Sequence, residues 1–205
     1  MKLYWSPRSP FVRKVMVFAH EVDVVDRLEL VRTPVALTSP NLEHIRARNP
    51  LGRIPTLETD EGLLLPESVL ICEYLDSLHD GEPLFPRTAE RRWPALRRHA
   101  LGSGLTEVLI LWRNERAREE QRRLAAMLDA CRTKTLATLD VLDREARELE
   151  RTPFDIGHVA VGCALGYLDY RFTDLDWREG RPELMRWFET FRARPSARAT
   201  EPYDD

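Results

Sequence analysis

The sequence predicts a small α/β domain with a four-stranded mixed sheet, followed by an all-helical domain. Two observations over its 205 residues support this fold class. Short apolar strand segments and amphipathic helix segments alternate as far as about residue 76, in the order strand, helix, strand, strand, strand, helix. From Thr88 onward no strand pattern appears, and apolar residues recur every three or four positions, as on one face of a helix. We therefore expect domains at residues 1–78 and 88–205, joined by a linker at 79–87 that contains Gly and Pro.

The first strand and the first helix are predicted within the opening 21 residues. The apolar strand Lys2–Trp5 runs into a proline-punctuated turn, and apolar residues at helical spacing then predict a helix over Pro10–Glu21. Pro10 suits the first helical position, because its missing N–H would have no intrahelical partner there. Ser9 is therefore the predicted N-cap. It places a hydroxyl at the positive end of a helix dipole, a geometry that can hold an anion.

The remaining elements of the first domain follow from shorter patterns. A second strand is predicted over Asp26–Leu30, and Thr33–Arg48 is expected to form a loop with a weak helix. The strands Thr56–Thr59 and Leu63–Leu65 flank a short acidic turn ending in Gly, which predicts a hairpin. A helix over Glu67–Leu78 completes the domain.

The second domain shows one long amphipathic helix and one buried helix. Residues at three- and four-residue steps mark the long helix: Leu124, Leu128, Cys131, Thr135, Leu139, Leu142, Ala146 and Leu149. For the next helix, Thr152 is the predicted N-cap, Pro153 takes the first helical position and Asp155 is the capping-box partner. The apolar, Gly-containing run Ile156–Leu168 then predicts a central buried helix. The charged stretch Arg113–Arg123 mixes both signs and reads as a solvated helix face.

Composition excludes several function classes. A net charge of −3, with 43% hydrophobic and 32% charged residues, gives no reason to expect binding to nucleic acid or to membranes. No apolar run approaches the ~18 residues of a membrane span and no basic-then-apolar leader opens the chain, so we expect a cytoplasmic protein. The histidines show no ligand spacing, and no metal is expected. The cysteines lack CxxC spacing and read as small buried side chains rather than redox or metal-binding groups: Cys72, Cys131 and Cys163.

Three segments together carry a family resemblance. They are a Ser-Pro-Phe turn at residues 9–11, a Pro before a strand within Asn49–Glu58, and a Glu-Ser pair at residues 67–68 that opens a helix. In this order and spacing they resemble the glutathione transferase family, and more closely its bacterial members whose first helix begins Ser-Pro-Phe-Val-Arg-Lys. The cap and apolar run after residue 151 resemble the N-capping box and core helix of the family's C-terminal domain. The resemblance covers nearly the whole chain and implies a thioredoxin-like first domain.

Glutathione chemistry gives the first segment a catalytic role. The glutathione thiol has an ordinary pKa of ~8.5, and its thiolate is the nucleophile. A hydroxyl that donates a hydrogen bond to the sulfur lowers this pKa. We predict that Ser9 is this donor, the alternative being a plain helix cap. Ser6 is a weaker candidate, and Tyr4 reads as a core residue. Related families carry Cys at this place for mixed-disulfide chemistry; serine cannot form a disulfide, so thiol reductase activity by that route is disfavoured.

The resemblance also implies the residues that hold glutathione. Pro55 would be cis and would turn Ile54, so that the Ile54 backbone pairs with the cysteinyl unit; read alone, Pro55 is a turn proline. Glu67 and Ser68 would bind the γ-glutamyl group through the helix N-terminus, and otherwise they form a helix cap. Arg53 would assist at the glycine end, although an exposed arginine before a strand is common. Phe11 belongs to the same predicted site.

Two classes of function remain open from the sequence. The first is an enzyme that conjugates glutathione, as co-substrate, with small electrophiles. Its apolar pocket would lie beside the helix around residues 101–113, and each lining residue is equally well explained by helix packing: Leu105, Thr106, Leu109 and Arg113. The second is a non-catalytic glutathione transferase-like binding or regulatory protein. The resemblance further implies a homodimer that pairs the small domain of one chain with the helical domain of the other.

Overall fold

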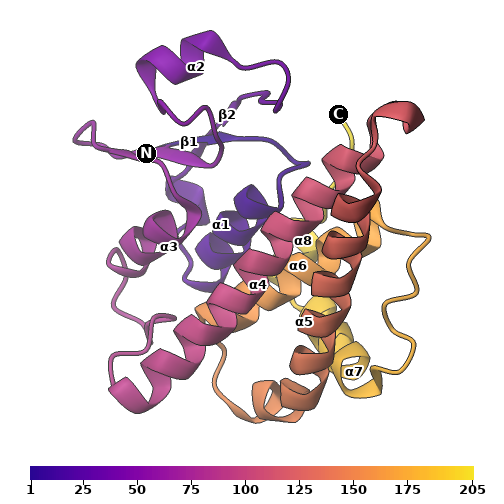
Figure 1. Cartoon of the computed structure of the whole chain (residues 1–205). Coiled ribbons are helices and arrows are strands. Elements are labelled where there is room, and N and C mark those ends of the chain that lie inside the picture. The colour runs from indigo at the N-terminus through magenta and orange to yellow at the C-terminus, as the bar shows by residue number, and fades with distance from the viewer. The chain divides into compact units, whose positions relative to one another are not determined.

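The computed structural model describes all residues from 1 to 205. They form two compact units, one of residues 1–87 with 195–205 and the other of residues 88–194 (Figure 1). The first unit differs from the predicted first domain in that it includes both the predicted linker and the end of the chain. The second unit contains helices and loops but no strand.

The first unit contains a four-stranded mixed sheet, as predicted. Its strands run in the order β2-β1-β3-β4. The pairing of β1 with β2 is parallel, while β1 with β3 and β3 with β4 are antiparallel. The strands are β1 (Lys2–Trp5), β2 (Glu29–Arg32), β3 (Thr56–Glu58) and β4 (Leu64–Leu65).

Helices cover both faces of this sheet. Figure 1 shows α1 and α3 on one side and α2 on the other. The fully buried apolar side chains of the unit include Leu3, Leu57, Val15, Phe18 and Ile71. The helices are α1 (Pro10–Glu21), α2 (Leu42–Ala47), α3 (Ser68–Asp76) and α8 (Pro195–Ala199).

The second strand begins later than predicted. Residues Val25–Arg27 form a 3₁₀ turn, in which the Leu28 N–H donates to the Val25 carbonyl at 3.0 Å. Strand pairing starts only at Glu29, which lies opposite Lys2. The predicted strand Asp26–Leu30 is therefore wrong at its start, because local turn hydrogen bonds take the backbone groups of its first residues.

Polar contacts join the linker and the chain end to the first unit. The Asp76 carboxylate at the end of α3 accepts hydrogen bonds from the N–H groups of Leu84 at 2.9 Å and Phe85 at 3.0 Å. The buried Arg13 guanidinium of α1 donates to the Ala197 carbonyl of α8 at 3.3 Å. These contacts explain why residues 79–87 and 195–205 pack with the sheet, whereas the sequence predicted a separate linker and assigned 195–205 to the helical domain.

The helical unit is built around one buried helix. Every residue of α6 from Ile156 to Leu168 is buried, as its apolar run predicts. The backbones of α4 and α6 approach closely, since a Cβ on Gly102 would lie 2.6 Å from the backbone of Ala160. No helix of the chain is both long and apolar enough to cross a membrane. The unit consists of α4 (Ala89–Arg116), α5 (Ala125–Arg151), α6 (Ile156–Arg171) and α7 (Pro182–Ala193).

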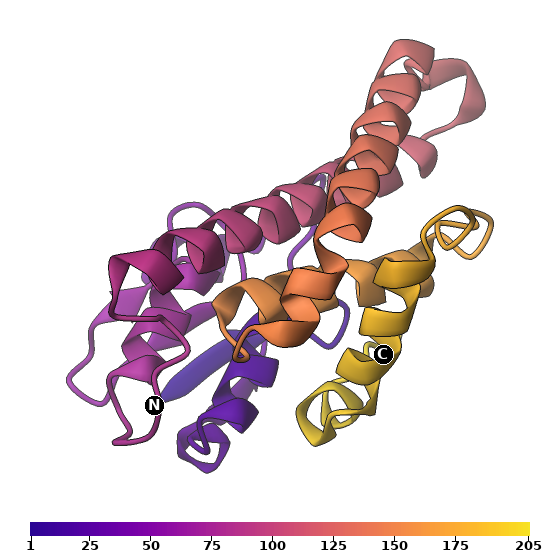
Figure 2. The ribbon, with the colours of Figure 1, turned by 90° about the horizontal axis from the view of Figure 1, so that it is seen from below.

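The charged stretch between α4 and α5 is a turn rather than one solvated helix face. Helix α4 ends at Arg116, and a 3₁₀ turn follows over Glu120–Arg122. The buried Glu115 carboxylate accepts from the Leu124 N–H at 2.7 Å, which holds the turn closed. Figure 2 shows α4 and α5 extending to a shared tip at this turn. Most of the stretch is exposed, as predicted, but Glu115 is buried and the helix ends at Arg116.

The N-cap of α6 is Asp155, and the predicted assignment to Thr152 is wrong. Asp155 Oδ1 accepts from the N–H groups of Gly157 at 2.8 Å and His158 at 3.2 Å, and the His158 ring returns to the Asp155 N–H. Thr152 is instead the C-cap of α5, with extended backbone and its hydroxyl donating to the Glu148 carbonyl at 3.0 Å. The residue before a proline avoids helical angles, so Pro153 here follows the end of α5.

We expect Asp155→Ala to lower the free energy of unfolding by about 2 kcal/mol, since it removes a buried cap and leaves N–H groups without an acceptor. Thr152→Ala should cost clearly less, because its bond to Glu148 lies at an exposed helix end. Urea denaturation of both variants measures the difference. Asp155→Asn is the matched control, as it keeps an oxygen acceptor. Equal losses in the two alanine variants would contradict the assignment.

Candidate functional site

The sheet register gathers the three predicted segments at one edge. Tyr4, near the end of β1, pairs with Thr56, the first residue of β3. Leu65, the last residue of β4, pairs with Leu57. The chain therefore leaves β1, enters β3 and leaves β4 at the same edge of the sheet. The segments that adjoin these strand ends are the Ser6–Ser9 turn, Ile54-Pro55 and Glu67-Ser68.

Ser9 is the N-cap of α1, as predicted. Its backbone is extended, with φ −85° and ψ 119°, and its Oγ accepts from the Val12 N–H at 3.3 Å. Capping uses the acceptor side of the hydroxyl, so the O–H hydrogen can still donate to a thiolate. Ser6 Oγ is more buried and accepts from the Arg8 N–H at 3.4 Å. Both serines therefore remain candidates for the donor to the glutathione sulfur, and Ser9 is the one at the helix terminus.

The Ile54-Pro55 peptide bond is cis, as the resemblance implies. Ile54 is buried and packs in a cluster with Tyr4 and Val12, which ties the approach to β3 to both β1 and α1. Gly52 precedes this segment with φ +63°, a left-handed conformation that favours glycine, and a Cβ there would lie 3.1 Å from the Ile45 side chain.

The carbonyl that precedes Ile54 is held by three side chains. The Arg53 oxygen accepts from His44 Nε2 at 3.0 Å, from Asn49 Nδ2 at 3.0 Å and from the Thr56 hydroxyl at 3.1 Å. All three side chains are buried. Sequence reasoning missed this clamp. Asn49 and Thr56 lie inside the predicted segment Asn49–Glu58, so their place in the sequence already associated them with Pro55. No local sequence pattern connects His44 with Arg53.

At the start of α3, the helix N-terminus is not capped by its own N-cap side chain. Glu67 is the N-cap and makes no side-chain bond to the helix N–H groups. Instead its Oε1 accepts a hydrogen bond from Ser68 Oγ at 2.7 Å, and Ser68 is only 1% exposed. Helix N–H groups without a cap of this kind form a site for an anion.

The side chains around the Ser6–Ser9 turn include charges that the sequence analysis did not single out. Arg8 Nε lies 3.1 Å from a carboxylate oxygen of Asp205, and Asp205 also pairs with Arg32 at 2.8 Å. The Phe11 ring is half-buried, with the Lys14 ammonium 5.2 Å from its centroid. The Arg53 side chain is exposed.

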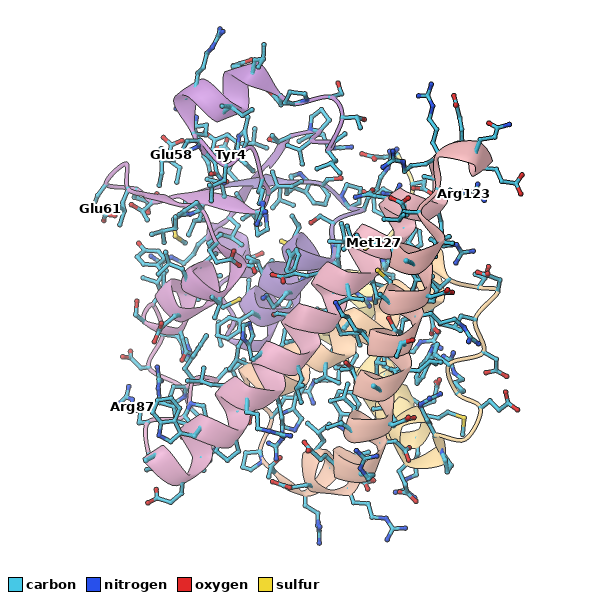
Figure 3. All side chains as sticks on the ribbon, in the orientation of Figure 1. Tyr4, Glu58, Glu61, Arg87, Arg123 and Met127 are labelled. Atoms are coloured by element: carbon cyan, nitrogen blue, oxygen red, sulfur yellow. The ribbon has the colours of Figure 1, made fainter.

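Tyr4 is a core residue, as predicted. Its hydroxyl donates to Glu58 Oε2 at 2.6 Å, and the two side chains lie together on the sheet (Figure 3). Burial raises the pKa of Tyr4, and the hydrogen bond from Tyr4 lowers the pKa of Glu58. The hydroxyl is thus committed to a carboxylate, which leaves Ser9 as the better donor to sulfur.

The predicted pocket residues lie on α4. Leu105, Thr106 and Leu109 are buried, and the Thr106 hydroxyl donates to the Gly102 carbonyl of the same helix at 3.0 Å. Helix packing alone also produces this burial, so their place in a pocket stays a prediction. Arg113 differs from them, since its side chain is exposed.

Comparison with known proteins agrees with this geometry. Residues 3–83 match "Glutathione S-transferase, N-terminal domain" and residues 115–190 match "Glutathione S-transferase, C-terminal domain". A solved glutathione transferase family member from Pseudomonas fluorescens Pf-5, with bound glutathione, is 40% identical with a TM-score of 0.95 over 99% of both chains. A second structure, from the same organism with bound S-(propanoic acid)-glutathione, is 39% identical with a TM-score of 0.91 over 100% of both chains. The "Uncharacterized GST-like protein YibF" of Escherichia coli K12 is 29% identical over 98% of each chain.

A thioredoxin-like mixed sheet followed by an all-helical unit is the fold of a glutathione transferase. With both domain matches and a 40% identical structure over its whole length, the chain belongs to the glutathione S-transferase family.

We expect Asn49→Ala to weaken glutathione binding without direct contact, because it removes a buried donor to the carbonyl next to Ile54. Leaving buried polar groups unpaired should also lower stability by about 1–3 kcal/mol. Asn41→Ala is the matched control. It removes the N-cap of α2, where Asn41 Oδ1 accepts from the His44 N–H at 3.0 Å, and it keeps the hydrogen bond from Asn49 to the Arg53 carbonyl. Calorimetry and thermal melting separate the two effects. A folded Asn49→Ala variant with wild-type affinity would remove the clamp from the site.

Proposed function

We propose that the chain is a glutathione transferase that binds reduced glutathione and conjugates its thiolate with small electrophiles. The observation that carries this proposal is the sheet register, by which the turn before α1, the approach to β3 and the start of α3 share one edge. The bound glutathione in the Pseudomonas fluorescens structure supports it. We also propose that the protein is cytoplasmic, because glutathione is abundant in the cytoplasm.

Each segment has its own part in binding glutathione. The Ile54 backbone pairs with the cysteinyl unit, as an added strand pairs with a sheet edge. The N–H groups at the start of α3 and the Ser68 hydroxyl bind the γ-glutamyl carboxylate, and Glu67 pairs with the ammonium of the same residue. Arg53 assists at the glycine carboxylate, and Phe11 lies beside the site.

Ser9 activates the sulfur by donating a hydrogen bond to the thiolate. Its neighbours Arg8 and Pro10 cannot act as a base, so the serine is a poor nucleophile and a sound donor. Each unit by which the thiol pKa falls corresponds to ~1.4 kcal/mol of preference for the thiolate. The thiolate electron pair then forms the C–S bond at the electrophilic carbon. The leaving group departs with its bonding electrons or, in an addition, the neighbouring carbon takes up a proton.

The proposal includes a homodimer in which small and helical domains of different chains meet. Each unit has exposed apolar side chains that could contact a second chain. Leu70 on α3 is 43% exposed, and Trp93 on α4 is 67% exposed.

Calorimetry with reduced glutathione tests the binding site. Ser68→Ala should weaken affinity about ten-fold or more, since a hydrogen bond to a charged group contributes about 1.5–3 kcal/mol. Ser77→Ala makes the same change at the other end of α3, where the hydroxyl donates to the Tyr74 carbonyl at 2.6 Å, and should bind like the wild type. The absence of wild-type binding at millimolar glutathione would overturn the proposal, and equal affinities would remove Ser68 from the site.

The role of Ser9 is tested by following thiolate absorbance against pH in the bound complex. Ser9→Ala should raise the pKa of bound glutathione and lower turnover by about one to two decades, with a smaller effect on affinity. Ser9→Thr keeps both hydroxyl and cap and should restore much of the loss, while Ser6→Ala tests the weaker candidate. Identical titration of wild type and Ser9→Ala would assign activation to another donor. Glutathione binding without turnover on any electrophile would favour the non-catalytic alternative.

A further inference from the structure

A carboxylate of the chain itself lies between two arginines at the sheet edge of the candidate site. Arg32 is the last residue of β2 and pairs with Trp5, the last residue of β1. Arg8 belongs to the turn that follows β1 and immediately precedes Ser9. The carboxylate of Asp205 contacts both guanidinium groups. Two cationic side chains therefore meet at the edge where Ser9 caps α1.

The two arginines bind this carboxylate in a specific geometry. Arg32 donates from Nη2 to Asp205 Oδ1 at 2.8 Å and from Nε to Oδ2, so that one guanidinium fork binds both oxygens. Arg8 Nε lies 3.1 Å from the same Oδ1 and 3.4 Å from a carboxylate oxygen of Asp204. The hydrogen bond from Arg32 lowers the pKa of Asp205, so the group is ionised at neutral pH. A planar fork assisted by a second cation is an arrangement that recognises carboxylates in general.

The contact with Asp205 is open to solvent and can be exchanged. Residues 201–205 follow α8 and belong to no helix or strand. The side chains of Arg8, Arg32 and Asp205 are 44%, 37% and 28% exposed. Ion pairs with this exposure contribute little net stability, because water and salt screen them. A dissolved carboxylate can therefore compete with Asp205 for the two arginines.

We propose that Arg8 and Arg32 form a binding site for the carboxylate of an electrophilic substrate, and that Asp205 occupies this site in the free protein. A carboxylate-bearing electrophile displaces Asp205, whereas an uncharged electrophile does not. Because Asp205 competes with every anion, a ligand that also gains affinity from the glutathione site displaces it most effectively. This inference rests on the proposed function, because it names the class of electrophile that the enzyme takes.

The carboxylate site is tested first without glutathione. 3-Phenylpropanoate and its uncharged amide are titrated calorimetrically into Asp205→Asn at constant ionic strength. We expect the acid to bind about ten-fold or more tightly than the amide, as for hydrogen bonds to a charged group. The preference should be smaller in the wild type, where Asp205 competes, and should disappear when Arg32→Gln is added to Asp205→Asn. Equal binding of acid and amide to Asp205→Asn would overturn the inference.

Asp204→Asn is the matched control for the change in charge. It removes a carboxylate from the neighbouring residue but keeps the fork between Arg32 and Asp205. The preference for the acid should therefore rise clearly less than it does in Asp205→Asn. An equal rise in both variants would show that net charge alone is responsible, and it would reject Asp205 as the occupant of the site.

The second arm connects the site to conjugation. S-(2-carboxyethyl)glutathione, S-propylglutathione and glutathione are titrated into the wild type, Asp205→Asn and Arg8→Gln. We expect the wild type to prefer the carboxyethyl over the propyl conjugate, Asp205→Asn to increase this preference and Arg8→Gln to lose most of it. No preference between the conjugates would reject the substrate class. Equal losses of affinity for all three ligands in Arg8→Gln would assign the arginines to the carboxylates of glutathione itself and would also reject it. If glutathione does not bind at all, the proposed function fails, while the acid and amide titrations still decide the carboxylate site.

Discussion

The antiparallel pairing of β1 with β3 is the constraint on which the candidate site depends. Because Tyr4 lies opposite Thr56, the end of β1 and the beginning of β3 share one sheet edge, and the pairing of β4 with β3 adds the start of α3. A shift of one residue would turn every side chain of β3 to the other face. Buried Leu3 and Leu57, paired across β1 and β3, prevent such a shift, so the apolar core also determines where the polar groups meet.

The clamp on the Arg53 carbonyl adds precision that strand pairing alone does not provide. Ile54 lies just before β3, outside the ladder, where a chain normally has conformational freedom. Three buried donors on one oxygen restrict that freedom before any ligand arrives. In the proposed site, a ligand that binds a fixed backbone loses less conformational entropy than one that binds a mobile loop. The polar core of the small unit therefore serves the site as well as the fold.

Local sequence patterns predicted most helices and strands. They could not predict contacts between residues that lie far apart in the chain. The strand Lys2–Trp5, the helix Pro10–Glu21 and the Ser9 cap follow from period and capping, which act over a few residues. The true cap of α6 was missed because Thr152 and Asp155 are both good N-caps, and it is the His158 ring, which completes the capping box on Asp155, that distinguishes them. The chain end packs on α1 through Arg13, and the His44 ring of α2 bonds the Arg53 carbonyl in the approach to β3. Such pairs become visible only once it is known which elements are neighbours.

Three helix starts differ in how completely their N–H groups are capped. At α6, Asp155 and His158 bond each other's backbone in a closed box, which also satisfies the Gly157 N–H. At α1, Ser9 accepts one N–H and keeps its own hydrogen to donate. At α3, the Glu67 side chain bonds Ser68 rather than the helix N–H groups. Because helix N–H groups need acceptors, the proposed site uses the incomplete caps at α1 and α3 to hold an anionic ligand. Both adjoin the same sheet edge, and the closed cap belongs to the helical unit, where it supports the core.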